Sequence, residues 1–262
     1  MGKPEWTNGR VYEDFVGRWS RLVAREFIQW LDMPAGLRWL DIGCGTGALT
    51  QTILQMANPS AVTGVDVSEP IVDFTRGNVT DLRVTFAVGD AQQIPADDES
   101  FDVAVSGLVL NFVPDMSKAL AEMMRVTAPH GIAACYVWDY TDRMQMMRYF
   151  WDAAHALNPG AASTDEGSRF PICRPEPLTN LFQNAGLKKI ETRPIDISTP
   201  FRNFDDYWTP FLSGQAPAPR YAMSLSEADR AALREELRAK LPTEADGSIQ
   251  LVARAWAIRG AR

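Results

Sequence analysis

The chain has 262 residues, and its 26 basic and 33 acidic side chains leave a formal net charge of −7. This acidic balance argues against a general nucleic-acid or anionic-membrane partner, because phosphate binding draws on clustered lysine and arginine. Hydrophobic residues make up 46% of the chain and charged residues 23%, which excludes wholesale disorder, collagen and coiled coil. The length predicts one large domain, or a core with an elaboration.

The three cysteines, Cys44, Cys135 and Cys173, are far apart and have no CxxC or histidine-spaced partner. They indicate neither a disulfide framework nor a zinc site, and they favour a reducing compartment. The segment from Met1 to Arg10 is charged without an apolar stretch, and no apolar run approaches the roughly 18 residues of a membrane span. We therefore expect a soluble, unprocessed cytoplasmic protein with no membrane span and no bound metal.

The first elements alternate between helix and strand. Apolar side chains recur at helical spacing from Val11 to Leu31 and predict one long amphipathic helix. The next elements are expected at residues 37–41 (strand), 43–47 (glycine-rich turn), 48–56 (helix) and 61–66 (strand). A further helix begins near Pro70, where proline suits a first helical turn.

The alternation continues through the middle of the chain. Strands are expected at residues 83–89, 101–106 and 132–138, with a helix at residues 116–126 between the last two. Such near-continuous apolar strands joined by helical segments are typical of a parallel sheet that is covered on both faces. Right-handed crossovers then place the strand-to-helix loops along one edge of that sheet.

The pattern changes after Asp139. A helix rich in methionine and aromatic residues, a polar stretch with glycine and proline, another helix and two closing strands are expected at residues 144–157, 158–177, 178–185, 188–197 and 249–258. Between the closing strands we expect a loop at residues 213–220 and a surface helix at residues 225–241, capped by Ser226 and Asp229.

The most informative stretch is Trp-Leu-Asp-Ile-Gly-Cys-Gly-Thr-Gly at residues 39–47. Its glycines permit positive φ angles and let a ligand lie against bare backbone, and the helix start behind them presents unpaired N–H groups. Acidic residues end three successive strands: Asp41, Asp66 and Asp90. These strand ends share one edge of a parallel sheet, so the pattern predicts a nucleotide site in which Asp66 accepts both ribose hydroxyls and Val67 packs on an adenine.

Two nucleotides fit this pattern. NAD fits because the G-x-G-x-x-A run at residues 43–48 satisfies the permissive dinucleotide fingerprint and Asp66 lies near the expected distance. S-adenosylmethionine is favoured by Asp41, because a carboxylate just before the first glycine would crowd a pyrophosphate but suits the ammonium group of a ligand without phosphate. Asp90 has no customary role in the dinucleotide fingerprint, and the sequence has no Tyr-x-x-x-Lys or comparable hydride-transfer constellation.

Four stretches closely resemble, in order and spacing, the successive motifs of class I S-adenosylmethionine-dependent methyltransferases, in particular the bacterial UbiE/Methyltransferase-11 group. They are Leu-Asp-Ile-Gly-Cys-Gly-Thr-Gly at 40–47, Gly-Val-Asp-Val-Ser at 64–68, Gly-Asp-Ala-Gln-Gln-Ile-Pro at 89–95 and Phe-Asp-Val-Ala-Val-Ser at 101–106. The resemblance covers roughly residues 36–137. It implies an α/β, Rossmann-like fold with a seven-stranded, mostly parallel sheet whose last strand is antiparallel. It also implies S-adenosyl-L-methionine as cofactor and S-adenosyl-L-homocysteine as product.

With this resemblance we predict a single methyltransferase domain that spans residues 1–262 and carries helical cap insertions. Neither insertion has enough continuous apolar pattern for a core of its own. The parts of the domain are an N-terminal helical cap at residues 1–35, a cofactor-binding core at 36–138, and cap or insertion segments at 139–177 and 201–245.

The resemblance also implies roles for the residues of the turn. Gly43, Cys44 and Gly45 are expected against the methionine part of the cofactor. Asp41 is expected near the ammonium group, directly or through a water. Cys44 is interpreted as a small residue of the turn rather than as a nucleophile.

Further roles are implied along the neighbouring strand ends. Asp66 is expected on the ribose, and Asp90, together with the backbone amide of Ala91, on the adenine. Ser106 and Leu108, at the end of the fourth strand, are expected to line the methionine side of the pocket.

The acceptor site is expected outside the sheet, where flat apolar side chains cluster. They are Trp6, Tyr12, Phe15 and Trp19 in the opening helix region, and Trp138, Tyr140, Met144, Met147, Phe150 and Trp151 after the fifth strand. Such stripes are more often plain core, and we assign most of these residues to it, but their density favours a small, largely apolar acceptor.

Trp19, Trp138 and His155 are the candidate acceptor residues. His155 is either a base or acceptor-binding group, or a partly buried helix histidine with a local partner. Arg18 either meets the carboxylate of the cofactor or is a solvated side chain. No catalytic residue is assigned, because positioning and exclusion of water supply most of what in-line displacement at a sulfonium methyl requires.

We therefore predict an enzyme that transfers a methyl group from S-adenosylmethionine to a small, largely apolar organic acceptor. A non-catalytic S-adenosylmethionine-binding protein is the alternative, and an NAD-dependent oxidoreductase is a less favoured third. The expected partner is a small molecule and not a nucleic acid, and the expected state is a monomer or homodimer. Whether oxygen, nitrogen, carbon or sulfur accepts the methyl group stays open.

Overall fold

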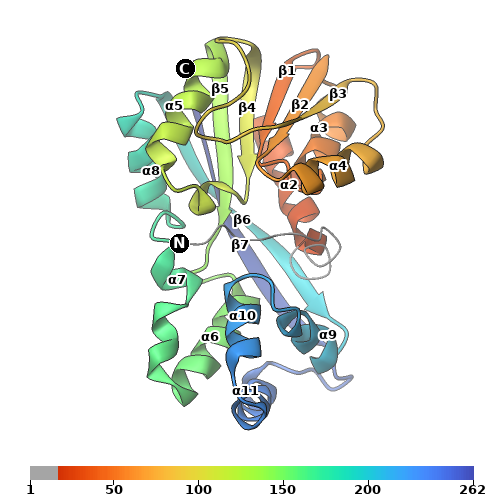
Figure 1. The fold of residues 1–262 in the computed structure, drawn as a ribbon, viewed down its shortest axis with the longest axis vertical. Helices are drawn as coiled ribbons and strands as arrows, with labels where there is room; N and C mark the ends of the chain where they lie inside the picture. The colour runs from red at the N-terminus through yellow and green to blue at the C-terminus, as the bar shows by residue number, and fades with distance from the viewer. Residues whose placement is uncertain (1–16) are drawn as a thin grey trace.

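The computed structural model describes residues 17–262. At its centre is a seven-stranded sheet with the strand order β3-β2-β1-β4-β5-β7-β6 (Figure 1). The strands are β1 Arg38–Ile42, β2 Ala61–Asp66, β3 Val84–Val88, β4 Phe101–Gly107, β5 Thr127–Trp138, β6 Lys188–Phe201 and β7 Ile249–Ala261. Strands β1 to β5 pair in parallel, and β7 runs antiparallel to both β5 and β6. The predicted α/β fold with an antiparallel last strand is confirmed.

Helices cover both faces of this sheet. They are α2 Arg18–Leu31, α3 Ala48–Met56, α4 Glu69–Asn78, α5 Met116–Val126 and α8 Pro175–Asn184. The strand order moves outward from β1 through β2 to β3 and in the other direction from β4 to β5, so right-handed crossovers put α3 and α4 on one face and α5 on the other. The carboxyl ends of the parallel strands consequently share one edge, which we call the carboxyl edge.

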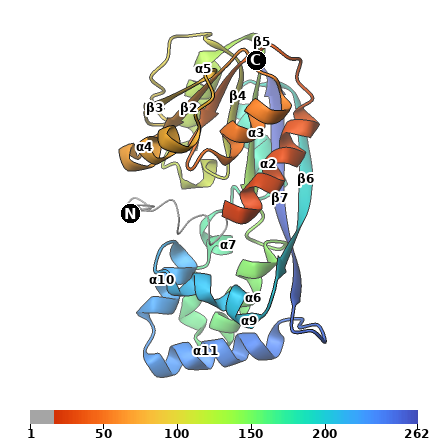
Figure 2. The same ribbon diagram turned by 90° about the vertical axis from the view of Figure 1, so that its right-hand side faces the viewer.

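A helical layer lies beyond the carboxyl edge, at the other end of the molecule (Figures 1 and 2). It contains α6 Gln145–Leu157, α7 Glu166–Arg169, α9 Phe204–Trp208, α10 Pro217–Ser224 and α11 Glu227–Lys240, and we call it the helical cap. Strand β5 leads into α6, and the long strands β6 and β7 run from the sheet into the cap (Figure 2). The sheet and the cap therefore share continuous strands rather than a single linker.

Most of the methionine and aromatic side chains after β5 form the core of the helical cap. Phe150 stacks on Phe211 with ring centroids 4.4 Å apart, and the hydroxyl of Tyr207 donates to the carbonyl oxygen of Met146 at 2.8 Å. Trp151 is completely buried beside them. These rings belong to the same buried apolar cluster as the core of the sheet, so their burial stabilises the cap together with the sheet.

Several element bounds differ from the sequence prediction: β5 begins at Thr127 rather than at residue 132, and α8 at Pro175 rather than at residue 178. Helix α10 begins inside the expected loop 213–220, because Pro217 occupies its first turn, where proline has no donor to lose. Strand β6 continues past residue 197 because its ladder with β7 extends along the cap to the pair Phe201 and Ile249. Strand β7 continues past residue 258 because Ala261 still pairs with Ile132 of β5 and Lys188 of β6. The expected cap of α11 is confirmed, as Ser226 Oγ accepts the backbone N–H of Asp229 at 3.1 Å.

Residues 1–16, which hold Trp6, Tyr12, Phe15 and the beginning of the expected opening helix, lie outside the described residues. Within residues 17–262, no helix combines the length and the apolar character needed to cross a membrane.

Candidate functional site

The glycine-rich turn connects β1 to α3 at the carboxyl edge. Gly43, Gly45 and Gly47 have φ angles of 72°, 51° and 87°. The backbone N–H groups of Gly43 and Cys44 both donate to the carbonyl oxygen of Val65, at 2.7 and 3.0 Å. These conformations favour glycine.

Gly43 is also required by its neighbour on the next loop. A Cβ at this position would stand 2.6 Å from the Cγ atoms of Val109, which follows β4. Gly47 is similarly close to Thr75, whose hydroxyl donates to the carbonyl oxygen of Gly45 at 2.5 Å. Thr75 of α4 and Val109 after β4 thus hold the turn in place. The sequence of the turn alone does not predict these two contacts.

Asp41 lies just before this turn and is buried. Its Oδ2 atom accepts the hydroxyl of Thr50 at 2.6 Å, whereas its Oδ1 atom has no hydrogen-bond partner within residues 17–262. Burial raises the pKa of Asp41 to about 7; the Thr50 hydroxyl opposes this rise and the charge of Asp66 adds to it. A buried acceptor without a donor is costly, and a cationic ligand group would satisfy it.

Asp66 ends β2 and supports the turn. Its Oδ2 atom accepts the backbone N–H of Gly45 at 3.0 Å, and its Oδ1 atom accepts that of Ser68 at 3.0 Å. Burial raises the pKa of Asp66, and these backbone donors counteract the rise. Each carboxylate oxygen has a second lone pair, so the side chain can still accept hydroxyl groups from a ligand. Val67 is 57% exposed and offers an uncovered apolar surface beside it.

Asp90 and Ala91 follow β3, the strand next to β2. The backbone N–H of Gly89 donates to the carbonyl oxygen of Asp66 at 2.9 Å, which ties the two strand ends together. Asp90 is exposed and accepts the backbone N–H of Gln92 at 2.9 Å. The structure thus places Asp41, Asp66 and Asp90 at the ends of adjacent strands along the carboxyl edge.

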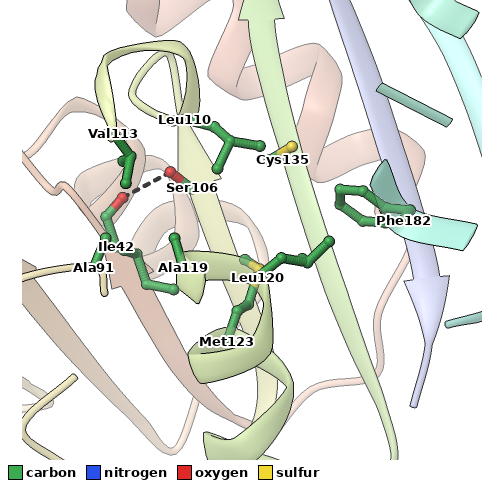
Figure 3. Close-up of a pocket in the computed structure, with 10 residues that line it drawn as sticks. All are labelled: Ile42, Ala91, Ser106, Leu110, Val113, Ala119, Leu120, Met123, Cys135 and Phe182. Carbon is green, nitrogen blue, oxygen red and sulfur yellow. Dashed lines mark hydrogen bonds between the residues drawn. The ribbon is translucent and has the colours of Figure 1, made fainter. Parts of the chain in front are cut away.

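Ser106 and Leu108 occupy the end of β4. The hydroxyl of Ser106 is buried and donates to the carbonyl oxygen of Ile42 at 2.9 Å, so it joins β4 to β1 (Figure 3). Leu108 has a φ of 63° although it is not glycine, and its backbone N–H donates to the carbonyl oxygen of Tyr136 at 2.8 Å. Such a backbone conformation is uncommon for a branched side chain and is held by its surroundings.

A small apolar cavity of about 20 Å³ lies beneath these strand ends, with room for about one water (Figure 3). It is lined by Ile42, Ala91, Ser106, Leu110, Val113, Ala119, Leu120, Met123, Cys135 and Phe182. Ala91 and Ser106, which the sequence assigned to opposite parts of the ligand, thus face a common space. Burial raises the pKa of both Cys44 and Cys135, so neither thiol has the character of a nucleophile.

The candidate acceptor residues lie on three different elements. Trp19 on α2 is buried against Phe201, with ring centroids 5.8 Å apart. Trp138 at the end of β5 is 2% exposed. His155 on α6 has its Nε2 atom 3.6 Å from the Oδ2 atom of Asp165, and this nitrogen has no hydrogen-bond partner among the described residues. The acceptor roles of these three residues stay predictions.

The site has residues that the sequence did not single out. Thr50 and Thr75 support Asp41 and the turn through their hydroxyls, and no sequence signal marks them. Among residues 17–262, no group of three or more histidine, cysteine, aspartate or glutamate side chains is arranged to hold a metal ion.

Comparison with solved structures supports the fold. Protein BH2331 from Bacillus halodurans C-125 is 15% identical, with a TM-score of 0.61 over 91% of this chain and 97% of that one. Phosphoethanolamine N-methyltransferase 2 from Haemonchus contortus, solved with phosphomonomethylethanolamine and S-adenosylhomocysteine, is 18% identical, with a TM-score of 0.58 over 97% of this chain and 56% of that one. These structures and the chain share a Rossmann-like fold, as solved methyltransferases have it.

The sequence comparisons agree with the predicted resemblance. Residues 40–135 match the family model described as "Methyltransferase domain". Demethylmenaquinone methyltransferase of Staphylococcus aureus (strain JH9) is 34% identical over 119 residues, which are 45% of this chain and 48% of the relative. The match thus spans about half the length of the relative.

Proposed function

We propose that the chain binds S-adenosylmethionine at the carboxyl edge and transfers its methyl group to a small organic acceptor. The observation that carries this proposal is the buried Oδ1 atom of Asp41, which lacks a hydrogen-bond partner within residues 17–262 and stands beside the positive-φ glycine turn. A buried carboxylate oxygen fits the ammonium group of an amino-acid ligand, whereas it would repel the diphosphate of NAD.

The residues around Asp41 fit the rest of the same ligand. Gly45 leaves room for its amino-acid part, because a Cβ at Gly45 would meet only the carbonyl oxygen of Gly43, at 3.9 Å. The lone pairs of Asp66 that its two backbone donors leave open suit ribose hydroxyls. The uncovered side chain of Val67 and the partly buried Ala91 suit the two ends of an adenine. These assignments agree with the predicted roles, and each remains to be tested by substitution.

The chemistry asks for position more than for a reactive side chain. The sulfonium group of the cofactor supplies a methyl carbon that is already activated for displacement. The chain must hold a nucleophile in line at about 3 Å and exclude water from the space between. The helical cap beyond the carboxyl edge is placed to close this space (Figure 2).

We also propose that the acceptor is small and largely apolar. The relative named demethylmenaquinone methyltransferase favours this class. The family match, however, ends at residue 135, and every helix of the cap comes after that residue. The choice of acceptor would therefore be made by a part of the chain outside that match.

We propose further that residues 1–262 form a single domain, with the cap segments 139–177 and 201–245 integrated into it. Continuity of β6 and β7 between sheet and cap supports this organisation.

The same proposal places the protein in the cytoplasm as a monomer or homodimer, with no nucleic-acid partner. Size-exclusion chromatography with light scattering tests the oligomeric state.

Calorimetric titration with S-adenosylmethionine, S-adenosylhomocysteine and NAD tests the cofactor. We expect both adenosyl ligands to bind and NAD to give no heat; binding of NAD alone would reverse the assignment. Turnover is tested with methyl-labelled S-adenosylmethionine against a metabolite panel, by mass spectrometry of the acceptors and detection of S-adenosylhomocysteine. Tight cofactor binding without any methylated product would favour a non-catalytic binding protein.

A further inference from the structure

We infer that Thr50 is a positioning residue for cofactor binding: its hydroxyl fixes the carboxylate of Asp41 so that the Oδ1 atom is presented to the ammonium group of the ligand. This inference rests on the proposed function and gives Thr50 a part in it. Thr50 is in the first turn of α3, the helix that begins directly behind the glycine-rich turn. It acts on the ligand through Asp41 and does not touch it.

The two side chains form a buried pair. Thr50 is 0% exposed and Asp41 is 1% exposed. The Thr50 hydroxyl donates to Oδ2 of Asp41 at 2.6 Å, whereas Oδ1 has no hydrogen-bond partner among residues 17–262. A carboxylate is planar and rigid, so a bond that holds Oδ2 against a buried helix also sets the direction of Oδ1. The pair therefore holds one oxygen and leaves the other for a ligand.

The start of α3 adds to this arrangement. Its N-cap residue is Gly47, which has no side chain, and its first turn holds no acidic residue. The unpaired N–H groups of a helix start favour a negative charge, and Asp41 supplies one from β1. Burial raises the pKa of Asp41, and both the hydroxyl and the backbone N–H of Thr50 act against this rise. Thr50 thus offers two donors to one carboxylate, and both favour its ionised form.

The other neighbours of Asp41 do not favour its ionised form. Its partners in the sheet, Gly64 on β2 and Val105 on β4, carry no charge. The charge of Asp66 adds to the rise of the Asp41 pKa that burial causes. Burial raises the pKa of the Cys44 thiol, and the charge of Asp41 adds to that rise, so the thiol stays neutral. The ionised carboxylate that an ammonium group needs therefore depends on the donors from α3.

Calorimetry with two ligands tests this role from about pH 5 to 8.5. S-adenosylhomocysteine carries the ammonium group, whereas 5′-methylthioadenosine has the same adenosine and sulfur but lacks the amino-acid part. The ratio of the two affinities therefore reports on the amino-acid part, and it cancels any titration of Asp66 at the ribose that both ligands share. In the unmodified protein this ratio should fall on the acidic side of about pH 7, where Asp41 is protonated.

Thr50→Val removes the hydroxyl and keeps the shape of the side chain. We expect the fall of the ratio to move to higher pH by about one unit, because a hydrogen bond to a charged group is lost. Near pH 7 the ratio should then be about fivefold lower than in the unmodified protein, while the affinity for 5′-methylthioadenosine stays within about twofold. Thr50→Ser keeps the donor and should restore the pH profile of the unmodified protein.

Thr52→Val is the matched control. Thr52 lies on the same helix and is 4% exposed, but its hydroxyl donates to the carbonyl oxygen of Ala48 at 2.8 Å. This variant should lose a buried hydrogen bond without any change in the pH profile. If Thr50→Val does not fold, Thr50→Cys takes its place; a thiol is a weak donor, so a smaller shift in the same direction is expected.

Two results would overturn the inference. One is a Thr50→Val protein whose pH profile matches that of the unmodified protein. The other is an equal loss of affinity for both ligands in Thr50→Val, which would mean that Thr50 only supports the fold of the turn. Failure of the proposed function looks different, because the unmodified protein would then bind neither S-adenosylmethionine nor S-adenosylhomocysteine.

Discussion

Arg18 at the start of α2 and Asp206 on α9 are joined by an ion pair between the sheet layer and the helical cap. The Nη1 atom of Arg18 donates to Oδ1 of Asp206 at 3.3 Å, across 188 positions of sequence. The guanidinium also lies over the rings of Trp19 and Phe201, at 4.5 and 4.8 Å from their centroids. Arg18 fastens the cap to α2 through Nη1, whereas its Nε and Nη2 atoms have no hydrogen-bond partner among the described residues.

Arg18→Ala should destabilise the protein by about 1–2 kcal/mol, because it removes an ion pair and two cation–π contacts. Urea denaturation measures the change, and limited proteolysis should show faster cleavage in the cap. Arg202→Ala is the control, since Arg202 approaches the same Oδ1 atom at 3.5 Å with a side chain that is 87% exposed. A loss in Arg202→Ala equal to that in Arg18→Ala would argue against the anchoring role.

Gly43→Ala should destabilise more than Gly36→Ala. Both glycines have positive φ, but a Cβ at Gly43 meets Val109 whereas one at Gly36 meets nothing within 4 Å. Backbone strain alone should cost Gly36→Ala about 1 kcal/mol, and the overlap should add about 1–3 kcal/mol at Gly43. Thermal unfolding of the two variants provides the comparison, and equal losses would show that Val109 moves aside at no cost.

Asp66→Ala should weaken binding of S-adenosylmethionine by about 1–3 kcal/mol, because hydrogen bonds to a charged acceptor are lost. Its support of the Gly45 and Ser68 amides is lost as well, so Asp66→Asn is a useful second variant that keeps one acceptor oxygen. Asp102→Ala is the control, as Asp102 binds Arg38 at the other end of the strands. Calorimetry measures the affinities; an Asp66→Ala protein that folds and binds normally would refute the ribose assignment.

Binding of S-adenosylmethionine should weaken as the pH falls below about 7. Burial raises the pKa of Asp41 from 3.8 to about 7 in the ligand-free protein, so the carboxyl is protonated below that pH and ionised above it. An ammonium group binds the ionised form, so the affinity should fall by up to about tenfold per pH unit on the acidic side. Titrations between pH 5 and 8.5, on the order of half a unit apart, measure the slope.

Asp41→Asn should remove this pH dependence. The control is Glu166→Gln, because burial in the cap also raises the pKa of Glu166 to about 7. That variant should keep the pH dependence of binding, since its carboxyl accepts from Trp151 away from the turn. Glu166→Gln should act instead on stability: a raised pKa in the folded state means that the contribution of Glu166 is lost as the pH rises through about 7. A slope that disappears in Glu166→Gln and persists in Asp41→Asn would contradict the ammonium assignment.

The sequence by itself determined where β1 to β5 lie along the chain and where the glycine-rich turn follows β1. The turn at residues 43–47 has three glycines, and acidic residues stand at the ends of three successive strands. This combination permits few other structures. The bounds of β2 and α5 could be read directly from apolar period and turn residues, because each element is decided by contacts along its own segment. The antiparallel closing strand followed from family resemblance.

Only the tertiary structure decided which side chains in the second half of the chain form the core. The aromatic side chains of α6 could line a pocket or fill a core. They became core because Tyr207 and Phe211, about 60 residues further along the chain, pack against them. The fastening of Arg18 is likewise invisible to pattern. Whether a polar atom is buried, and whether it finds a partner, depends on elements that are distant in sequence and meet only in the folded protein.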